Sequence, residues 1–584
     1  MKELQYLNRY FIKYRGRLLL GLFITVVARI FALLVPMKVG DIVNVVRDRV
    51  NGTISVAEME SQLWTSIFII IGATLLSAFF TFLMRQTIIV VSRYIEFDLK
   101  NEIYKQYQRL SLSFYKQNRT GDLMNRISED VSKVRMYAGP ALMYSTTTVT
   151  LFIVVVSYMF YKAPILTLYA IAPLPILSIA IYKLSIAINK RSTVVQQYLS
   201  KLTTFTQESF SGIAVIKAYG IEPRINTEFN SLSEGSKEKN IDLAKVQALF
   251  FPLMILLIGL SNILVIYIGG NRFINGQIEE LGTIVEFLIY VNMLTWPVAV
   301  VGWVTSMVQQ AEASQKRINE FLNEQPAIIN KAENPTAIKG KIEFKDLWFT
   351  YPDTNITALQ GISFSVNTGE TLSIIGHTGS GKSTILELIG RLYDVAPGQL
   401  FIDNTPIQEI HLDSLRESIG YVPQDAFLFS DSIKNNIKFG KEDASDKEVI
   451  EAAKRAAVHK NIVGFSHGYD TVLGERGITL SGGQKQRVSI ARAIIKDPEI
   501  LLFDDCLSAV DTETEEEILQ NLHQISRNKT TIIVSHRISS AKNADKILVL
   551  EQGQIVQEGT HTQLIAADGY YKELYAKQLS EKEM

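Results

Sequence analysis

The sequence predicts an α-helical membrane domain, with six transmembrane helices and long cytoplasmic extensions, fused to an α/β domain. The first observation is that runs of twenty or more residues with almost no charge recur between Leu18 and about Val308. The second is that short β-rich runs, helical segments and Gly-rich turns alternate from Gly340 onward, as in a mostly parallel sheet. We expect a membrane domain over residues 1–322, a linker over residues 323–340 and the α/β domain over residues 341–584.

The uncharged runs are long enough to cross about 30 Å of hydrocarbon as helices. Buried helices of a soluble all-α protein would instead show a polar stripe every 3.6 residues, and Leu151–Phe160 shows none. We therefore expect six membrane spans, at Leu18–Gly40, Leu63–Val91, Gly139–Tyr161, Ile165–Ile188, Phe250–Gly270 and Leu281–Val308.

The distribution of Lys and Arg predicts the orientation of these spans. The N-terminal tail and the connections Arg93–Arg135 and Lys190–Lys245 together hold 22 basic residues, against 4 in the alternate connections. The positive-inside rule therefore places both termini in the cytoplasm. The first 16 residues lack the cleavage pattern of a signal peptide, so we expect none to be removed. The two basic connections are long and show helical spacing, which predicts helices that extend into the cytoplasm.

The overall composition excludes two classes of protein. The 59 basic and 59 acidic residues balance, so we expect no nucleic-acid partner. The one cysteine, Cys506, permits neither an internal disulfide nor a cysteine-based metal cluster.

A phosphate-binding loop follows the strand-like run Thr371–Ile375. Residues 376–383 read GHTGSGKS, which is the G-x-x-x-x-G-K-[ST] pattern, and a helical segment begins at Thr384. We expect Lys382 to face the β- and γ-phosphates and the Ser383 hydroxyl to bind Mg²⁺. The predicted nucleotide contacts of this segment are Gly376, Thr378, Gly379, Ser380, Gly381, Lys382, Ser383 and Thr384.

A second strand-like run, Ile500–Phe503, ends in Asp504. A carboxylate at the end of such a strand suits the residue that helps to hold Mg²⁺ opposite the phosphate loop. Together the two segments predict a nucleoside triphosphatase that uses ATP and Mg²⁺.

The segment Leu480-Ser481-Gly482-Gly483-Gln484 resembles the signature of the ABC transporters. Further segments resemble other motifs of that family in the same order: Tyr351 the aromatic that stacks on adenine, Gln424 the Q-loop, Ser508–Asp511 the D-loop and His536 the switch histidine. The resemblance implies that ATP lies between two nucleotide-binding domains, with the phosphate loop of one facing Ser481, Gly482, Gly483 and Gln484 of the other. It also implies catalytic roles for Asp505, His536 and Gln424, and metal ligation by Ser383, Gln424 and Asp504.

The membrane half resembles the exporters of the same family. Phe114–Arg126 and Gly212–Tyr219 are similar to the cytoplasmic coupling segments, and Gly474–Gly477 to the exporter X-loop. Six spans before one nucleotide domain is the half-transporter layout, which implies a dimer with a second half-transporter. The implied protein is a multi-pass protein of a bacterial inner membrane that contacts lipid and exports a small amphipathic substrate, a drug or a lipid. Fusion of both domains in one chain opposes an importer.

Asp505 departs from the family pattern, which has glutamate after the Mg²⁺ aspartate. The aspartate carboxylate is withdrawn by about 1 Å, enough to cost around a hundredfold in a positioned reaction. We therefore expect a low-hydrolysis site in one half of a heterodimer. Three alternatives stay open: adequate hydrolysis with Asp505 as base, a homodimer with two slow sites, and an ATP-gated regulatory or channel-like subunit.

Arg29, Arg85 and Glu286 are ionisable residues within the predicted spans. Such residues are by default candidates for a substrate cavity or for pairing. Arg85 and Glu286 lie nearer the ends of their spans and could also extend to the membrane surface.

Overall fold

The computed structural model describes the whole chain except Met1, residues 475–476, 478–479, 508–511 and 527, and Met584. The described residues form two compact units. The first contains Met1–Tyr107 and Gly121–Asn323, and the second contains Gln108–Thr120 and Glu324–Met584. The short segment Gln108–Thr120 thus belongs with the C-terminal unit, although it lies within the N-terminal half of the sequence.

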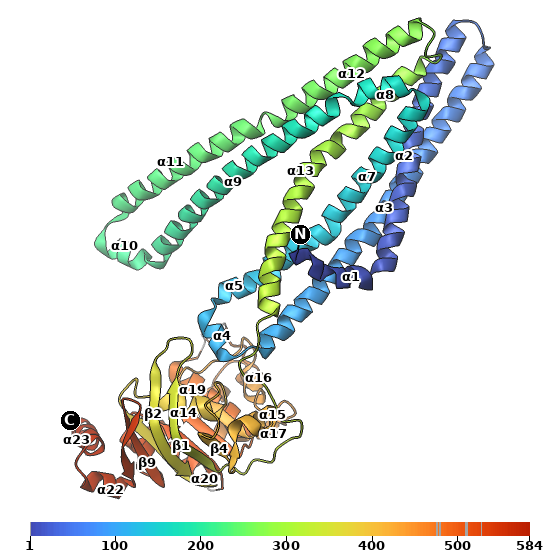
Figure 1. Cartoon of the computed structure of the whole chain (residues 1–584). Helices are drawn as coiled ribbons and strands as arrows, with labels where there is room; N and C mark the ends of the chain where they lie inside the picture. The colour runs from blue at the N-terminus through green and yellow to red at the C-terminus, as the bar shows by residue number, and fades with distance from the viewer. Residues whose placement is uncertain (1, 475–476, 478–479, 508–511, 527, 584) are drawn as a thin grey trace. The chain divides into compact units, whose positions relative to one another are not determined.

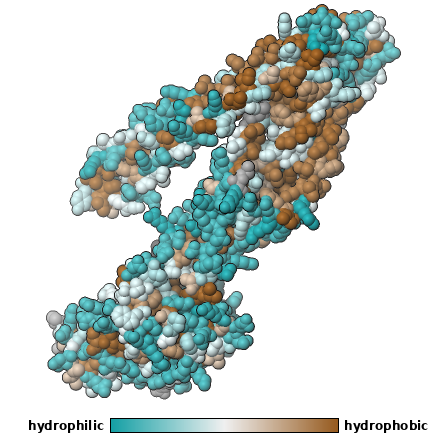
Figure 2. Space-filling model, in the orientation of Figure 1, coloured by the Kyte–Doolittle hydropathy of each residue, from teal (hydrophilic) through white to brown (hydrophobic). Residues whose placement is uncertain are grey.

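The prediction of six apolar helices is confirmed. Within the described residues, six helical stretches are long and apolar enough to cross a membrane: Arg15–Val50, Val56–Arg109, Thr120–Lys162, Pro164–Ser211, Glu222–Ile274 and Gly282–Leu322. Figure 2 shows hydrophobic side chains gathered along one part of these helices and hydrophilic ones over the parts that extend beyond it. The helical stretches therefore extend beyond their apolar parts.

The first unit is entirely helical in its described elements (Figure 1). The helices α9 and α11 pack along each other as an antiparallel pair, and the short α10 joins them. The elements in chain order are η1 (Glu3–Leu7), α1 (Asn8–Lys13), α2 (Arg15–Val50), α3 (Val56–Arg109), α5 (Thr120–Asn125), η2 (Arg126–Asp130), α6 (Val131–Met136), η3 (Tyr137–Ala141), α7 (Leu142–Lys162), α8 (Pro164–Ile171), α9 (Pro173–Ser211), α10 (Ile213–Tyr219), α11 (Glu222–Gln247), α12 (Phe250–Ile274) and α13 (Gly282–Leu322).

Two glycines allow the backbones of α2 and α13 to approach closely. A Cβ atom added at Gly282 would lie 2.0 Å from the Gly40 carbonyl oxygen and 2.9 Å from Asn44 Cγ. The Gly282 N–H also donates a hydrogen bond to Asn44 Oδ1 at 2.7 Å. Because backbone meets backbone here, no larger residue fits at Gly282 unless one helix moves.

Replacement of Gly282 by alanine is therefore expected to lower the free energy of unfolding by about 1–3 kcal/mol, as for other overpacked sites. The measurement is the fraction of purified full-length protein that stays monodisperse after heating. Gly270→Ala is the matched control, because Gly270 lies in α12 with nothing within 4 Å of its added Cβ. Equal heat resistance of the two variants would contradict the close packing of α2 on α13.

The second unit is built on two sheets among its described residues. A six-stranded sheet has the order β10-β9-β3-β8-β7-β6, in which β10 alone is antiparallel to its neighbour, and a four-stranded antiparallel sheet has the order β2-β1-β4-β5. The strands are β1 (Ile342–Thr350), β2 (Thr357–Val366), β3 (Thr371–Gly376), β4 (Leu400–Ile402), β5 (Thr405–Pro406), β6 (Ile419–Val422), β7 (Ile500–Asp504), β8 (Thr530–Val534), β9 (Lys546–Glu551) and β10 (Gln554–Gly559).

The helices of this unit connect and cover the sheets. They are α4 (Leu112–Gln117), α14 (Lys382–Ile389), η4 (Ile407–Glu409), α15 (Leu412–Glu417), α16 (Ile433–Lys438), α17 (Asp446–Arg455), α18 (His459–Val463), η5 (Gly468–Asp470), α19 (Gly482–Ile495), α20 (Thr512–Ser526), α21 (Ile538–Ala541), α22 (His561–Ala566) and α23 (Tyr570–Glu583).

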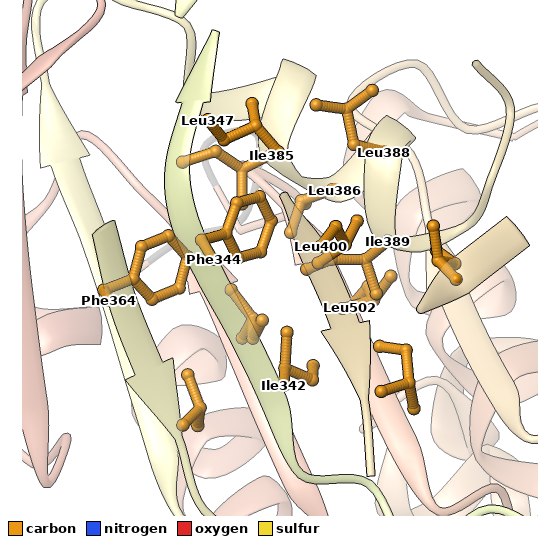
Figure 3. Packing of buried hydrophobic residues seen from close by; sticks show 14 of the residues in the cluster. Ile342, Phe344, Leu347, Phe364, Ile385, Leu386, Leu388, Ile389, Leu400 and Leu502 are labelled. Atoms are coloured by element: carbon orange, nitrogen blue, oxygen red, sulfur yellow. The ribbon is translucent and has the colours of Figure 1, made fainter. Parts of the chain in front are cut away.

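The main core of this unit encloses α14 between the two sheets. Figure 3 shows Ile385 and Ile389 of α14 packed among Phe344 and Leu400 of the small sheet and Leu502 of the large sheet. All five side chains are at most 2% exposed. This packing fixes the N-terminus of α14, and with it the glycine-rich turn that precedes the helix, at the carboxyl end of β3.

Candidate functional site

The predicted phosphate loop lies between β3 and α14, as the pattern requires. Gly379 and Gly381 have φ angles of +81° and +97°, which glycine adopts without steric cost. A Cβ atom on Gly381 would also lie only 2.4 Å from the Ala358 carbonyl oxygen. The loop lines a cavity of about 460 Å³ with Thr378, Gly379, Gly381, Lys382, Ser383 and Thr384.

Lys382 is buried at the floor of this loop. Its Nζ donates hydrogen bonds to the carbonyl oxygens of Gly376 at 3.0 Å and His377 at 2.7 Å. Burial lowers the pKa of Lys382, whereas the carboxylates of Asp505 and Asp504 act in the opposite direction. Ser380, another buried residue of the loop, has a hydroxyl without a hydrogen-bond partner among the described residues. Of these two residues only Lys382 lines the cavity, and its ammonium is a cation that suits a phosphate group, whereas the predicted contacts Gly376 and Ser380 are not among the lining residues.

The predicted metal ligands Ser383 and Asp504 meet at the end of β7. The Ser383 hydroxyl donates a hydrogen bond to Asp504 Oδ1 at 2.9 Å. Burial is the main cause that raises the pKa of Asp504, and the Ser383 bond opposes it. Hydroxyl and carboxylate oxygens are the ligands that Mg²⁺ takes in nucleotide sites, and Ser383 and Asp504 supply both at this cavity, so the residues fit this ion.

Asp505 lines the same cavity and has an unusual backbone conformation. Its φ angle is +41°, in the left-handed region that aspartate and asparagine enter more readily than most residues. The Asp505 N–H donates to the Val534 carbonyl oxygen at 2.9 Å, so the turn after β7 is tied to β8. The neighbouring Cys506 is buried, and burial raises the pKa of its thiol, which makes a reactive thiolate unfavourable.

Tyr351 also lines the cavity and directly follows β1. Its hydroxyl lies 2.9 Å from Thr384 Oγ1 and donates to Glu387 Oε2 at 2.8 Å. Burial raises the pKa of Tyr351, so its hydroxyl stays protonated. Glu387 was not predicted from the sequence, because a glutamate on the α14 surface has an ordinary helical environment.

Gln424 and His536 also line the cavity. Gln424 follows β6 and is exposed, while its carbonyl oxygen lies 3.4 Å from Gln486 Nε2 of α19. His536 follows β8, and its carbonyl oxygen accepts a hydrogen bond from Gln578 Nε2 of α23 at 2.9 Å. Burial, and after it the charge of Lys382, lowers the pKa of His536, so its imidazole is neutral at pH 7. One cavity thus brings together Tyr351, the phosphate loop, Gln424, Asp504, Asp505 and His536.

The predicted signature is not among the residues that line this cavity. Ser481 is the N-cap of α19, and a capping box joins it to Gln484, with Ser481 Oγ accepting from the Gln484 N–H at 3.3 Å. The Gln484 side chain accepts from the Ser481 N–H at 3.0 Å in return. Gly482 and Gly483 begin the helix, so their backbone N–H groups lie at its positive end. This helix N-terminus suits an anion, but it does not line the cavity of the chain's own phosphate loop.

Two predicted motifs lie partly or wholly outside the described residues. They are the D-loop at Ser508–Asp511 and the X-loop residues Glu475 and Arg476. The coupling segments are described. The first, Phe114–Arg126, contains the last four residues of α4 and is divided between the units after Thr120, and the second, Gly212–Tyr219, contains α10 in the first unit.

The ionisable residues of the predicted spans differ in their surroundings. Arg29 is half-buried in α2, and its Nε has no hydrogen-bond partner among the described residues. Arg85 is exposed on α3. Glu286 is 3% exposed in α13 and accepts a hydrogen bond from the Tyr290 hydroxyl at 3.0 Å. Glu286 is therefore paired inside the helical bundle, whereas Arg85 faces outward.

The fold and the cavity define a multi-pass membrane protein that carries a P-loop nucleotide-binding unit. Residues 18–298 match the ABC transporter transmembrane region, and residues 359–508 match the ABC transporter family. The chain belongs to the ABC transporter family and is an exporter-type half-transporter. It is an ATP hydrolase that couples ATP hydrolysis to transport, and exporters of this type function as dimers of half-transporters.

Two named relatives align with most of the chain. The chain is 34% identical over 579 residues to the multidrug resistance-like ATP-binding protein MdlA of Escherichia coli, a match that covers 99% of this chain and 97% of that protein. It is 37% identical over 486 residues to the ATP-dependent lipid A-core flippase of Syntrophus aciditrophicus, with 83% and 80% covered. A solved bacterial Atm1-family ABC exporter with ATP bound superposes with a TM-score of 0.78 at 26% identity, over 97% of this chain and 99% of that one.

Proposed function

We propose that this half-transporter exports a hydrophobic or amphipathic molecule, a drug or a lipid, across a bacterial inner membrane. Two relatives support this substrate class through their names, one multidrug resistance-like and the other a lipid A-core flippase. The distribution of Lys and Arg supports an orientation with both termini in the cytoplasm. In this orientation the nucleotide unit takes ATP from the cytoplasm.

The proposed ATP site is the cavity that Tyr351 and the phosphate loop line. Tyr351 stacks on adenine, Lys382 and the loop N–H groups bind the phosphates, and Ser383, Asp504 and Gln424 would hold Mg²⁺. When bound, this ion would neutralise charge on the transferred phosphoryl group. His536 is neutral at pH 7, so its imidazole can accept one hydrogen bond and donate another at the site.

The observation that carries the finer proposal is Asp505, which stands where exporters of this family have glutamate. Its carboxylate is about 1 Å shorter in reach than that of glutamate, so water is held less well for attack. We propose that this chain is the slow-hydrolysing half of a heterodimer. In that assembly its signature, Ser481 to Gln484, completes the competent site on the partner half-transporter.

The export proposal is tested in liposomes that contain the purified full-length assembly. We expect Mg-ATP turnover to rise when a cationic amphiphilic dye or a phospholipid with a labelled headgroup is present, and the label to cross the membrane only with ATP. Turnover that rises without movement of either label would overturn the proposed substrate class. An ATP-dependent ion leak without label movement would support a gated channel instead.

The proposal that the signature acts on the partner's ATP site leads to a separate prediction. Ser481→Arg places a long cation at the N-terminus of α19, where the partner's ATP phosphates would bind, and also removes the N-cap that bonds the Gln484 N–H. We expect total ATP turnover to fall at least about tenfold, while photolabelling of this chain by azido-ATP stays near the wild-type level.

Ser481→Ala is the control for the cap, because it removes the same hydrogen bond at a cost of about 1 kcal/mol without adding bulk or charge. We expect it to reduce turnover less than Ser481→Arg. Loss of azido-ATP labelling on the Ser481→Arg chain itself would contradict a signature that acts on the partner's site.

A further inference from the structure

Lys116, a residue of α4, lies in the nucleotide cavity although 235 residues separate it from Tyr351 in the sequence. The segment that contains it, Gln108–Thr120, belongs to the same compact unit as the cavity. Lys116 was identified in the sequence only as part of a coupling segment. Its position beside the cavity gives it a contact with the group that we propose binds the adenine base.

The ammonium of Lys116 lies over two aromatic rings. Its Nζ is 5.0 Å from the centroid of Tyr351 and 5.1 Å from that of Tyr393, within the range of cation–π attraction. It also lies 3.8 Å from Glu387 Oε1, and the other oxygen of Glu387 accepts the Tyr351 hydroxyl. Burial, which lowers the pKa of Lys116, is outweighed by Tyr393, Glu387 and Asp353, so the ammonium stays charged.

A base stacked on the ring face of Tyr351 that Lys116 covers would need the space of this ammonium. Stacked rings have centroids about 4.5–7 Å apart, and Lys116 Nζ lies at that separation from Tyr351. Phe349 and Tyr393 also pack on Tyr351, with their planes at 81° and 85° to it, but both are at most 6% exposed and cannot move easily. The Lys116 side chain is 39% exposed and has a flexible aliphatic chain, so it is the group that can move away from the Tyr351 ring.

We propose that Lys116 is a positioning residue whose ammonium covers one face of the Tyr351 ring and is displaced when the adenine base binds. This inference rests on the proposed ATP site. Displacement also breaks the contacts of α4 with Tyr393 and Glu387, and α4 follows the long helix α3 after only Leu110 and Ser111. Base binding thereby changes the contacts that hold α4 within its own unit. A bare triphosphate fills the phosphate loop and leaves Lys116 in place.

The test compares ATP with inorganic tripolyphosphate, which has the phosphates but no base. The full-length assembly is photolabelled with azido-ATP without turnover, and the concentration of each competitor that halves labelling of this chain is measured. We expect Lys116→Gln to make ATP about 2- to 5-fold more effective, because the base no longer displaces a cation, and to leave tripolyphosphate unchanged. Lys116→Arg, which keeps a cation that binds aromatic rings, is expected to leave ATP at or below wild-type effectiveness.

Lys345→Gln is the matched control. Lys345 Nζ also lies over an aromatic ring, 4.6 Å from the Phe401 centroid, and pairs with Glu343 at 3.3 Å, but it is on β1 away from the cavity. It should change neither competitor. An unchanged or lower effectiveness of ATP against Lys116→Gln would overturn the displacement of Lys116. If neither ATP nor tripolyphosphate reduced azido-ATP labelling of the wild-type chain, the proposed ATP site would instead be overturned.

The second readout is the rate at which an amine-acylating reagent modifies Lys116, followed by mass spectrometry of the peptide. We expect ATP to raise this rate and tripolyphosphate to leave it unchanged. Equal rates with and without ATP would contradict displacement, because an ammonium that stays on Tyr351 remains equally shielded.

Discussion

Lys382→Ala is expected to reduce the affinity of this chain's own site for ATP by about a hundredfold or more. The Lys382 ammonium is held beneath the loop by the Gly376 and His377 carbonyl oxygens, so it is in place before the phosphates arrive. Alanine removes this cation, so no lysine then balances the charge of the β- and γ-phosphates. The measurement is azido-ATP photolabelling of this chain in the full-length assembly.

Lys546→Ala is the matched control for this prediction. Lys546 lies in the same unit, and its Nζ also donates to a backbone carbonyl oxygen, that of Ser365 at 3.1 Å, but it does not line the cavity. It should retain labelling. Wild-type labelling of the Lys382→Ala chain would show that its ATP is bound elsewhere.

Local patterns were sufficient to predict much of the nucleotide unit. The run Thr371–Ile375 forms β3, and Ile500–Phe503 with Asp504 forms β7, because central parallel strands are continuous apolar runs. The helix after the loop begins at Lys382, two residues before the predicted start, because Gly381 in a left-handed conformation is its N-cap. The four-stranded sheet was not predicted in detail, since its short strands β4 and β5 carry little periodic signal.

Contacts between distant parts of the sequence could not be predicted in the same way. Lys116 and Glu387 meet at Tyr351, and nothing in the local spacing of any of the three indicates this meeting. Likewise, Asp505 has a φ angle of +41° and its N–H bonds the carbonyl oxygen of Val534 in β8, a partner that the local sequence around Asp505 does not indicate. The chemistry of each motif was visible in the sequence, but the neighbours that adjust it were not.

The effect of Asp505→Asn on ATP turnover should distinguish a heterodimer with one slow site from a homodimer with two. Asparagine is nearly the same size as aspartate and also enters the left-handed region, so the backbone at φ +41° is preserved and only the charge is lost. In a heterodimer whose competent site uses the partner's glutamate, total turnover should fall less than about twofold. In a homodimer both bases are lost together, and turnover should fall by about a hundredfold or more.

Asp505→Glu tests whether reach limits this site. The added methylene extends the carboxylate by about 1 Å and should raise turnover in either kind of dimer, because the base then approaches the attacking water. Glutamate tolerates a left-handed backbone less well, at a cost of about 1–2 kcal/mol, so some heat stability should be lost together with this gain. Turnover is measured on the purified assembly at saturating Mg-ATP, with subunit composition determined by mass. A heterodimer that loses nearly all activity with Asp505→Asn would overturn the low-hydrolysis proposal and identify Asp505 as the working base.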